Sequence, residues 1–129
     1  MQNGFEGIVN GLYTVPNCVM LDCGTEVPSS CDGEIMRSFC GGRLFCLVKE
    51  DGGYDIGRAV CKCHVIRLFG IGLVGGGILC RVMRLLGNAG ICFYGASVSE
   101  CGIAIALPRE RLSEALRILS SALLEGERV

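Results

Sequence analysis

The segment Cys61-Lys-Cys63-His64 holds the single histidine of the chain beside two of its ten cysteines. Thiolate and imidazole groups bind zinc, but structural zinc sites need four ligands and commonly space paired cysteines by two to four residues. Closing a four-ligand site here would require a distant thiol such as Cys18 or Cys23. The same histidine could instead activate a thiol as a nucleophile. A metal or redox module therefore stays open as a hypothesis, and the pattern favours a strand with two small thiols and a polar edge histidine.

A glycine-rich segment with the pattern Gly70-x-Gly72-x-x-Gly75 follows directly. In a dinucleotide-binding fingerprint a strand precedes the first glycine, and an acidic residue about 20 positions further on binds the ribose. Here the glycines fall within a predicted strand, and residues 91–99 contain no acidic side chain. No Lys-Ser or Lys-Thr pair follows the glycines, so the segment is no P-loop either. The sequence therefore predicts no bound nucleotide and no other cofactor.

The charged side chains show no arrangement typical of catalysis or of a charged partner. The acidic pairs Asp22/Glu26 and Glu50/Asp51 lie in turn-like places, where carboxylates are usually just solvated. A net charge of −1 provides no basic surface for nucleic acid or anionic lipid. These features argue against paired-carboxylate chemistry and against a nucleic-acid partner.

Hydropathy and cysteine content bear on where the protein resides. Half of the residues are hydrophobic, so the chain can bury a core. The longest uncharged stretches, residues 68–80 and 85–99, are shorter than the roughly 20 apolar residues that a membrane-spanning helix needs. The first residues lack the basic and apolar regions of a secretory signal. We therefore expect a cytoplasmic protein without membrane contact, whose thiols stay reduced.

The second half of the chain carries the clearer periodicity. Residues 68–74 are an apolar run typical of a buried strand, and three glycines end it. From Ile78 the apolar residues follow a helical period, and the segment 88–90 supplies residues that tolerate positive φ where this helix should stop. A second amphipathic helix is predicted from Arg109 to the neighbourhood of Gly126.

Two strands are predicted between these helices, over residues 91–99 and 101–108. The second alternates strictly between large residues (Ile103, Ile105, Leu107) and small ones (Gly102, Ala104, Ala106). One face is therefore bulky, and the other is bare enough to let another backbone or sheet approach closely. Residues 68–125 are predicted to form a β-α-β-β-α unit, with two helices packed on one face of a small antiparallel sheet.

The first half is less regular. Strands are predicted over residues 17–23, 43–50 and 59–69, and a short helix over residues 33–40. This gives a second, shorter β-α-β-β outline. No linker separates the halves, so we expect one compact body or a loose tandem pair.

Residues 68–125 resemble the second ACT module in the regulatory region of aspartate kinases. The likeness consists of local signatures that occur in the same order, although no single one is specific. They are a Val-Gly-x-Gly turn (74–77), an Ala-Gly-Ile step (89–91), a Ser-x-Ser-Glu corner (97–100), the alternating Ile103 and Ile105, and a helix centred on Ala115-Leu116.

The resemblance implies an α+β, ferredoxin-like ACT fold (βαββαβ). In this family a first ACT module is inserted within the second, and a strand near the start of the region completes the second module's sheet. Residues 7–12 would supply that strand, and residues 17–67 would form a degenerate first module. We accordingly divide the chain into residues 1–67, an N-terminal strand plus a degenerate ACT-like module, and residues 68–129, an ACT module.

In aspartate kinases these modules pair side by side and bind end-product amino acids such as lysine or threonine at the module interface. The implied effector-binding residues are Gly75, Gly76, Gly77, Ile78, Leu79, Ile91, Cys92, Phe93 and Tyr94. N–H groups at the helix start would bind the ligand's carboxylate, and strand carbonyl groups would bind its amine. Cys92 stands where the family usually has an asparagine, and the turn before the helix lacks the family's Pro-Gly pair.

The resemblance thus implies a non-catalytic, ACT-type regulatory domain or subunit that acts in amino-acid biosynthesis, such as the biosynthesis of lysine. No segment resembles the catalytic kinase domain. Regulation would be allosteric, in a homodimer or in association with a kinase catalytic chain. Two alternatives remain open. One is a ligand-free structural remnant that dimerises through the bare sheet face, and the other is the metal or redox module around His64.

Overall fold

The computed structural model describes residues 7–25, 34–51, 58–75, 77–100 and 102–125. They form a six-stranded sheet in the order β2-β3-β1-β4-β6-β5, in which all neighbouring strands are antiparallel. The strands are β1 (Ile8–Asp22), β2 (Glu34–Cys40), β3 (Arg43–Lys49), β4 (Ala59–Ile71), β5 (Gly95–Ser99) and β6 (Gly102–Leu107). The helices are α1 (Gly77–Asn88) and α2 (Leu112–Ser120), with short helical turns η2 (Leu73–Gly75), η3 (Arg109–Arg111) and η4 (Ser121–Glu125).

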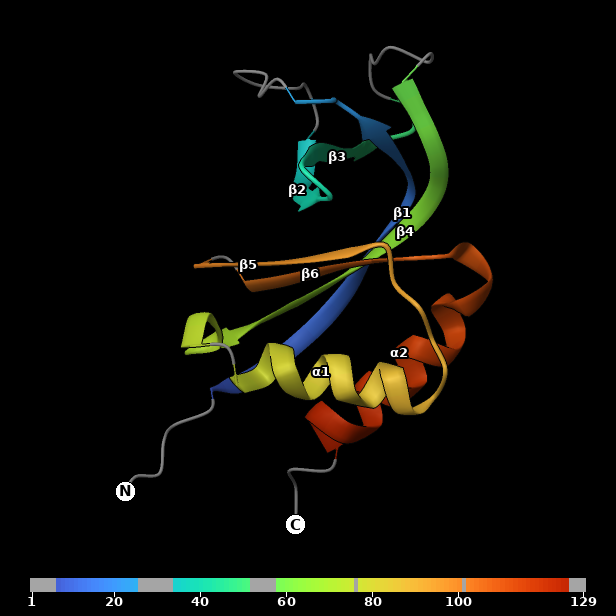
Figure 1. Cartoon of the computed structure of the whole chain (residues 1–129). Coiled ribbons are helices and arrows are strands. Elements are labelled where there is room, and N and C mark those ends of the chain that lie inside the picture. Colours follow the sequence, from blue (N-terminus) through green and yellow to red (C-terminus); the bar gives the residue numbers. More distant parts are fainter. Residues whose placement is uncertain (1–6, 26–33, 52–57, 76, 101, 126–129) are drawn as a thin grey trace.

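The two longest strands, β1 and β4, pair along their length and form a ribbon that runs through the whole sheet (Figure 1). We call β5, β6 and the adjoining residues 8–15 and 64–71 of the ribbon the helical half. We call β2, β3 and residues 18–22 and 59–63 of the ribbon the β2–β3 half. The β1–β4 register shifts between Val15 and Cys18, where Asn17 has a φ of 58°. Such a bulge bends a strand, and it lies where the ribbon passes from one half to the other.

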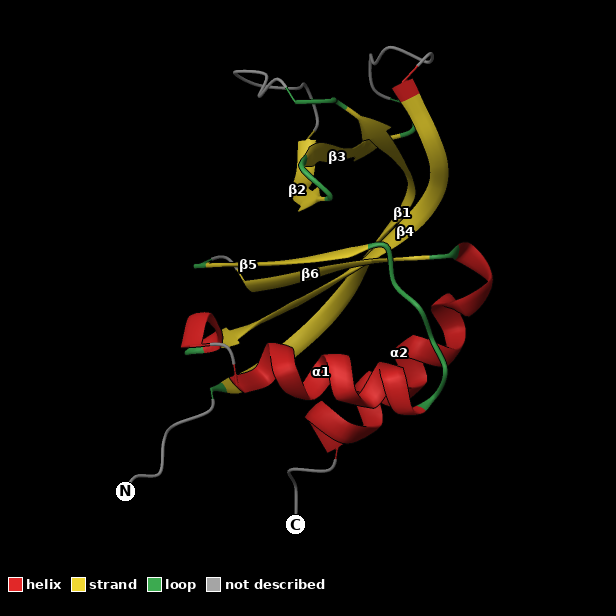
Figure 2. Ribbon diagram, in the orientation of Figure 1, coloured by secondary structure: helices red, strands yellow, loops and turns green. Residues whose placement is uncertain are grey.

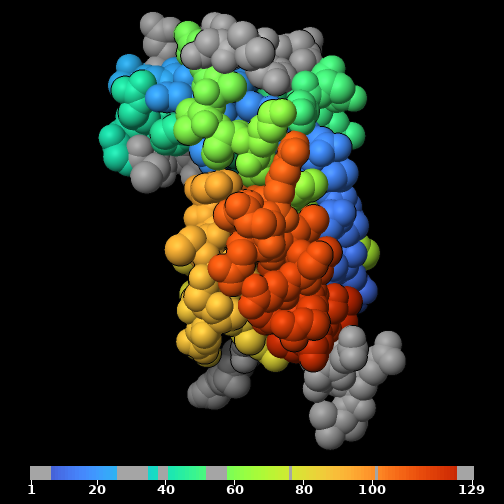
Figure 3. All heavy atoms as spheres, turned by 90° about the vertical axis from the view of Figure 1, so that its right-hand side faces the viewer, coloured from blue at the N-terminus to red at the C-terminus, as the bar shows by residue number. Residues whose placement is uncertain are grey.

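The two helices cover one face of the helical half, and the β2–β3 half lies over the opposite face (Figure 2). A view turned by 90° shows the two halves one above the other, with β1 running down beside the C-terminal helical segment (Figure 3). The sheet is thus coiled so strongly that its two ends face each other. β6 is consequently buried on both of its faces from Ile103 to Leu107.

Three apolar clusters fill this arrangement. The first lies between the helices and the sheet and includes Ile66, Leu86 and Leu119. The second lies between the two halves of the sheet and includes Met20, Met36, Leu47, Cys63, Val65 and Ala106. The third lies on the other face of the β2–β3 half and consists of Val19, Leu21, Cys23, Leu44, Cys46 and Val48. Neighbours such as Val65 and Ile66 belong to different clusters because successive strand residues point to opposite faces.

The end of α1 confirms the predicted stop signal. Gly90 has a φ of 73°, and its N–H donates to the Gly87 carbonyl at 3.0 Å. The Ile91 N–H donates to the Leu86 carbonyl at 2.9 Å, and both side chains are buried in the first cluster. This is the Schellman arrangement, in which a left-handed glycine satisfies the last carbonyls and an apolar residue folds back onto the helix.

The predicted helix over residues 33–40 is wrong. Residues 34–40 of this segment form β2, which pairs antiparallel with β3 from Glu34 to Cys40, and residue 33 lies outside the described residues. Gly41 and Gly42 join the two strands with φ values of 60° and 79°, the paired positive angles of a two-residue hairpin turn of type I′. The Gly-Gly pair was the stronger local signal, because few other residues adopt both angles without strain.

The bounds of two other predicted strands also change. The strands predicted over residues 59–69 and 68–74 are one continuous strand, β4, which ends at Ile71 and is followed by η2. The strand predicted over residues 91–99 begins only at Gly95, because residues 91–94 carry the chain irregularly from the end of α1 to the sheet. The N-terminal strand expected at residues 7–12 exists as the first part of β1, beside β4.

The alternating strand is confirmed as β6, and its two faces differ as predicted. Ile103, Ile105 and Leu107 pack against the helices, whereas Ala104 and Ala106 are buried under the β2–β3 half. The bare face therefore does receive a closely approaching sheet, but this sheet belongs to the same chain. Dimerisation through that face, as the structural-remnant alternative supposed, is excluded in this arrangement, since Ala106 is 0% exposed within one chain.

Candidate functional site

The effector-binding residues predicted near the start of α1 differ in their exposure. Gly75 is exposed at the end of η2, and Gly77 begins α1. Ile78 is buried in the first cluster, and Leu79 packs against it. Gly76 lies outside the described residues. The accessible part of this segment is therefore its turn, whereas its apolar side chains hold α1 on the sheet.

The effector-binding residues predicted after α1 are divided in the same way. Ile91 is buried and Phe93 packs against the first cluster, whereas Cys92 is exposed and Tyr94 is 44% exposed. The backbone of Tyr94 is anchored, because its N–H donates to the Ala106 carbonyl at 2.8 Å. This segment thus presents two side chains to the surface from a fixed backbone.

The two predicted segments lie at opposite ends of α1 (Figure 1). A helix rises 1.5 Å per residue, so the 12 residues of α1 span about 18 Å. One small ligand cannot touch both ends within one chain. The structure therefore does not gather the nine predicted residues into a single pocket.

The Cys61–His64 cluster is also divided. Cys61 and Cys63 face the cluster between the two halves, whereas the intervening residue and His64 point to the other face of β4. His64 was predicted at a strand edge, but β4 is central there, paired with β1 on one side and with β6 on the other. Among the described residues, no group of three or more histidine, cysteine or acidic side chains is placed to hold a metal ion.

Burial opposes nucleophilic chemistry by these thiols. It raises the pKa of the Cys63 thiol to about 12, and it also raises the pKa values of Cys18 and Cys61. The thiolate is the reactive form of cysteine, so a thiol of this kind stays protonated and unreactive at neutral pH. Burial, with a contribution from the Arg109 charge, lowers the pKa of His64 and favours its neutral form. These side chains act as packing groups.

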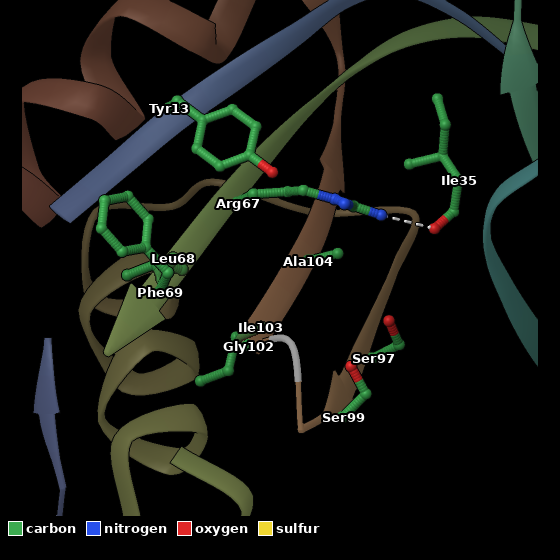
Figure 4. A pocket seen from close by; sticks show the side chains of 10 residues that line it. All are labelled: Tyr13, Ile35, Arg67, Leu68, Phe69, Ser97, Ser99, Gly102, Ile103 and Ala104. Atoms are coloured by element: carbon green, nitrogen blue, oxygen red, sulfur yellow. Dashed lines mark hydrogen bonds between the residues drawn. The ribbon is translucent and has the colours of Figure 1, made fainter. Parts of the chain in front are cut away.

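A pocket that the sequence did not suggest lies between the two halves (Figure 4). Its wall on the helical half follows one row of directly opposed residues across four strands. This row is Tyr13 (β1), Arg67 (β4), Ala104 (β6) and Ser97 (β5). Phe69, Gly102 and Ser99 also line the pocket, and Ile35 of β2 lies on the opposite side. The pocket encloses about 60 Å³.

One feature of the sequence could have indicated this pocket. Arg67 is the only charged residue in the run 65–71, which is otherwise apolar. A lone arginine in a buried strand needs a polar partner, and here its Nη2 donates to the Ile35 carbonyl oxygen at 2.8 Å. The partner comes from a strand more than 30 residues away, so only the fold reveals it.

Comparisons with known proteins agree on the fold. No family model and no curated protein sequence matches the chain. Among solved structures, the aspartate kinase of Clostridium acetobutylicum, described as an allosteric enzyme, superposes with a TM-score of 0.69 at 12% sequence identity. That match covers 97% of this chain, which spans only 37% of the enzyme's length. A structure of aspartokinase alpha and beta subunits superposes with a TM-score of 0.63 at 16% identity, covering 88% of this chain and 92% of the other.

These likenesses establish a fold shared with aspartate kinase chains, namely an antiparallel sheet with two helices on one face. At such low identity they carry no residue role. Among the described residues, no helix is long and apolar enough to cross a membrane.

Proposed function

We propose that this chain is a non-catalytic regulatory module of the ACT class, similar to the regulatory region of aspartate kinase. It would sense an amino acid of the lysine or threonine class and would act through a second copy or a kinase catalytic chain. The observation that carries this proposal is the strand order, because the same four-stranded arrangement occurs twice around the shared β1–β4 ribbon.

The connections of the helical half, β4-α1-β5-β6-α2, support its interpretation as a βαββαβ unit. The chain leaves β4, passes through α1 and enters β5, which lies beyond β6 in the sheet. This is the split βαβ connection of ferredoxin-like folds. After β6, α2 leads back toward the strand position beside β4, which β1 occupies. The position of β1 beside β4 supports the interpretation that an N-terminal strand completes this unit, as the resemblance implies.

The β2–β3 half repeats this order without helices among its described residues. From its edge inward, the β2–β3 half has the order β2-β3-β1-β4, and the helical half has the order β5-β6-β4-β1. The two orders correspond strand by strand, with β1 and β4 taking each other's places. This supports the interpretation of residues 17–67 as a degenerate first module inserted into a second. The proposed division between residues 67 and 68 then falls within β4, so the two modules share a strand and are not joined by a linker.

An interface between two copies would complete the effector site. Residues 75–79 and 91–94 lie at opposite ends of α1. In two copies related by a two-fold axis with their α1 helices antiparallel, each end of one helix meets the other end of its partner. The turn before α1 of one copy and the exposed Cys92 and Tyr94 of the other would then border one ligand, at a module interface as in aspartate kinases.

Calorimetry and thermal unfolding of the full chain with lysine, threonine and methionine test this proposal. A ligand at 100 times its Kd stabilises the folded state by about 2.7 kcal/mol, which is easily detected as a rise in Tm. Tyr94→Ala should weaken binding, and Val60→Ala, an exposed apolar position in the β2–β3 half away from α1, should not. If none of the three amino acids binds at millimolar concentration, the sensing function is wrong. The ligand-free remnant would then be the remaining interpretation.

A further inference from the structure

The pocket between the two halves is hollow because its floor consists of two small residues, Gly102 and Ala104. Ala104 lies directly between Arg67 and Ser97 in the cross-strand row. Gly102 has a φ of 127°, and a side chain there would collide with the Leu68 carbonyl oxygen. The longer side chains of β4 and β5 therefore flank the short residues Ala104 and Gly102, which leaves a depression in the sheet (Figure 4).

The residues that line this pocket include one charged side chain, Arg67, and several neutral polar ones. The Arg67 side chain extends across Ala104 toward Ile35, with the Tyr13 hydroxyl beside it and the Ser97 hydroxyl opposite (Figure 4). One of its N–H groups donates to the Ile35 carbonyl. A guanidinium has five such groups, and no carboxylate among the described residues forms an ion pair with Arg67. A partly buried cation thus faces a pocket with neutral walls.

We propose that this pocket binds a small carboxylate, with the Arg67 guanidinium as its anchor. A carboxylate accepts two parallel hydrogen bonds from a guanidinium, and charge-assisted bonds of this kind are stronger than neutral ones. The Ser97 and Tyr13 hydroxyls can donate to a carboxylate oxygen or accept from an ammonium group. A volume of about 60 Å³ suits a carboxylate with a few further atoms.

The aromatic border of the pocket fits a ligand with an apolar part. Tyr13 and Phe69 are 47% and 43% exposed, and their ring centroids are 6.1 Å apart. Both rings line the pocket and are exposed, so the portion of the ligand beyond its carboxylate would emerge beside them. A small amino acid or a short-chain carboxylic acid has this combination of groups.

The pocket also offers a way for a ligand to act on the fold. Ile35 belongs to β2, whereas the other lining residues belong to the ribbon and to β5 and β6. A ligand that holds Arg67 in place would favour the arrangement in which β2 lies against the helical half, by its differential affinity for that state. This rests on the proposed function for the role of effector but assigns the effector to a different site, because none of the residues predicted at the ends of α1 lines this pocket. If the effector binds here, Arg67→Met weakens its binding and Tyr94→Ala does not.

Calorimetry on the full chain tests the site with acetate, glycine, lysine, threonine and inorganic phosphate as probes. At least one carboxylate should bind, and Arg67→Met should weaken it about 10- to 100-fold, the usual range for a hydrogen bond to a charged group. Arg67→Lys keeps the charge but not the planar fork, so its loss should be smaller. Ser97→Ala should weaken binding less than Arg67→Met does.

Arg84→Met is the matched control, since it removes the same charge from an exposed position on α1. It should leave the affinity unchanged. Circular dichroism melts of each variant check folding, and if Arg67→Met does not fold, Arg67→Lys carries the test. Binding of phosphate but of no carboxylate would overturn the assignment.

The remaining outcomes separate this site from the proposed function. If an amino acid binds equally well to wild type and Arg67→Met, the carboxylate site is wrong and the sensing function stands. If acetate binds through Arg67 but no amino acid binds, the site is right and the sensing function fails. If no probe binds the wild type, both are wrong.

Discussion

The two halves of the molecule have the same strand order but differ in what covers them. In the helical half, α1 and α2 cover one face of the sheet and the β2–β3 half covers the other. The β2–β3 half keeps its order among the described residues without a helix, through the Gly41-Gly42 hairpin and the pairing of β1 with β3 and β4. Strand order is therefore held by the ribbon and the hairpin, and the helices add burial. The shared ribbon predicts that neither half is stable without the other.

Truncation of one core residue in each half tests this dependence and should have the largest effect. Leu119→Ala empties the core beneath α2, and Leu44→Ala empties the third cluster; both side chains are fully buried. Each should lower the free energy of unfolding by about 2–5 kcal/mol. Because the ribbon belongs to both halves, each variant should shift a single urea transition, seen alike by circular dichroism and tyrosine fluorescence. Two separate transitions, of which Leu44→Ala moves only one, would show that the halves unfold independently.

Enlarging the small face of β6 tests how tightly the halves pack together. Ala106→Leu adds three carbons where Ala106 is fully buried against the β2–β3 half. Overpacking of this kind should cost about 1–3 kcal/mol in urea unfolding. Sedimentation should show that the variant has the same oligomeric state as the wild type, because this face is covered within one chain. A variant that dissociates an oligomer without loss of stability would mean that the face contacts a second copy after all.

The helical half was the more predictable from sequence, for a physical reason. Ile78, Val82 and Leu86 repeat at helical spacing because one face of α1 packs on the sheet. The residues of β6 alternate in size at strand spacing because its two faces pack against different partners, the helices and the β2–β3 half. The segment of β2 has no such pattern, and its identity depends on the turn that follows it. The predicted stop of α1 was correct because a left-handed glycine is a local signal.

The pocket could not have been found in the same way. Its row joins Tyr13, Arg67, Ala104 and Ser97, and their alignment depends on the register of three strand pairs. Register is set by tertiary packing and bulges, such as the shift between Val15 and Cys18, and these leave little trace in a single sequence. The predicted residues at the ends of α1 came from a resemblance, and they stay a prediction.

The same glycine substitution should have opposite effects in the two halves. Gly41 has a φ of 60° in the β2–β3 hairpin, where Gly41→Ala should cost about 1–2 kcal/mol because side chains disfavour this region. Gly87 lies in the last turn of α1 with open space around its missing Cβ. Gly87→Ala should therefore stabilise the protein by up to about 1 kcal/mol. Thermal melts of the two variants should move in opposite directions; a loss at Gly87 would contradict the helix assignment there.

The smallest expected effect is on the pH dependence of stability, through two carboxylates. Asp22 lies within the β2–β3 half, and Glu50 lies at the junction of the two halves. A hydrogen bond from Lys62 lowers the pKa of Glu50, which contacts β4 and also, through Arg109, the helical half. A hydrogen bond from Arg43 lowers the pKa of Asp22 within the β2–β3 half. A depressed folded-state pKa stabilises above the unfolded value, and this contribution is lost as the pH falls through the folded value. Wild type should thus lose stability below about pH 4, close to the usual carboxyl pKa values.

Urea unfolding of Glu50→Gln and Asp22→Asn at pH 7 and pH 3 separates the two contributions. Each variant should lose less stability on acidification than wild type, because it lacks one titrating group. Both carboxylates are partly exposed to solvent, so 0.5 M NaCl should reduce the differences. Only Glu50→Gln also releases Arg109 at the start of the second helical segment, so it alone should increase hydrogen exchange where η3 joins β6. Equal exchange there in both variants would mean that the junction is held by the apolar cluster between the halves and not by this ion pair.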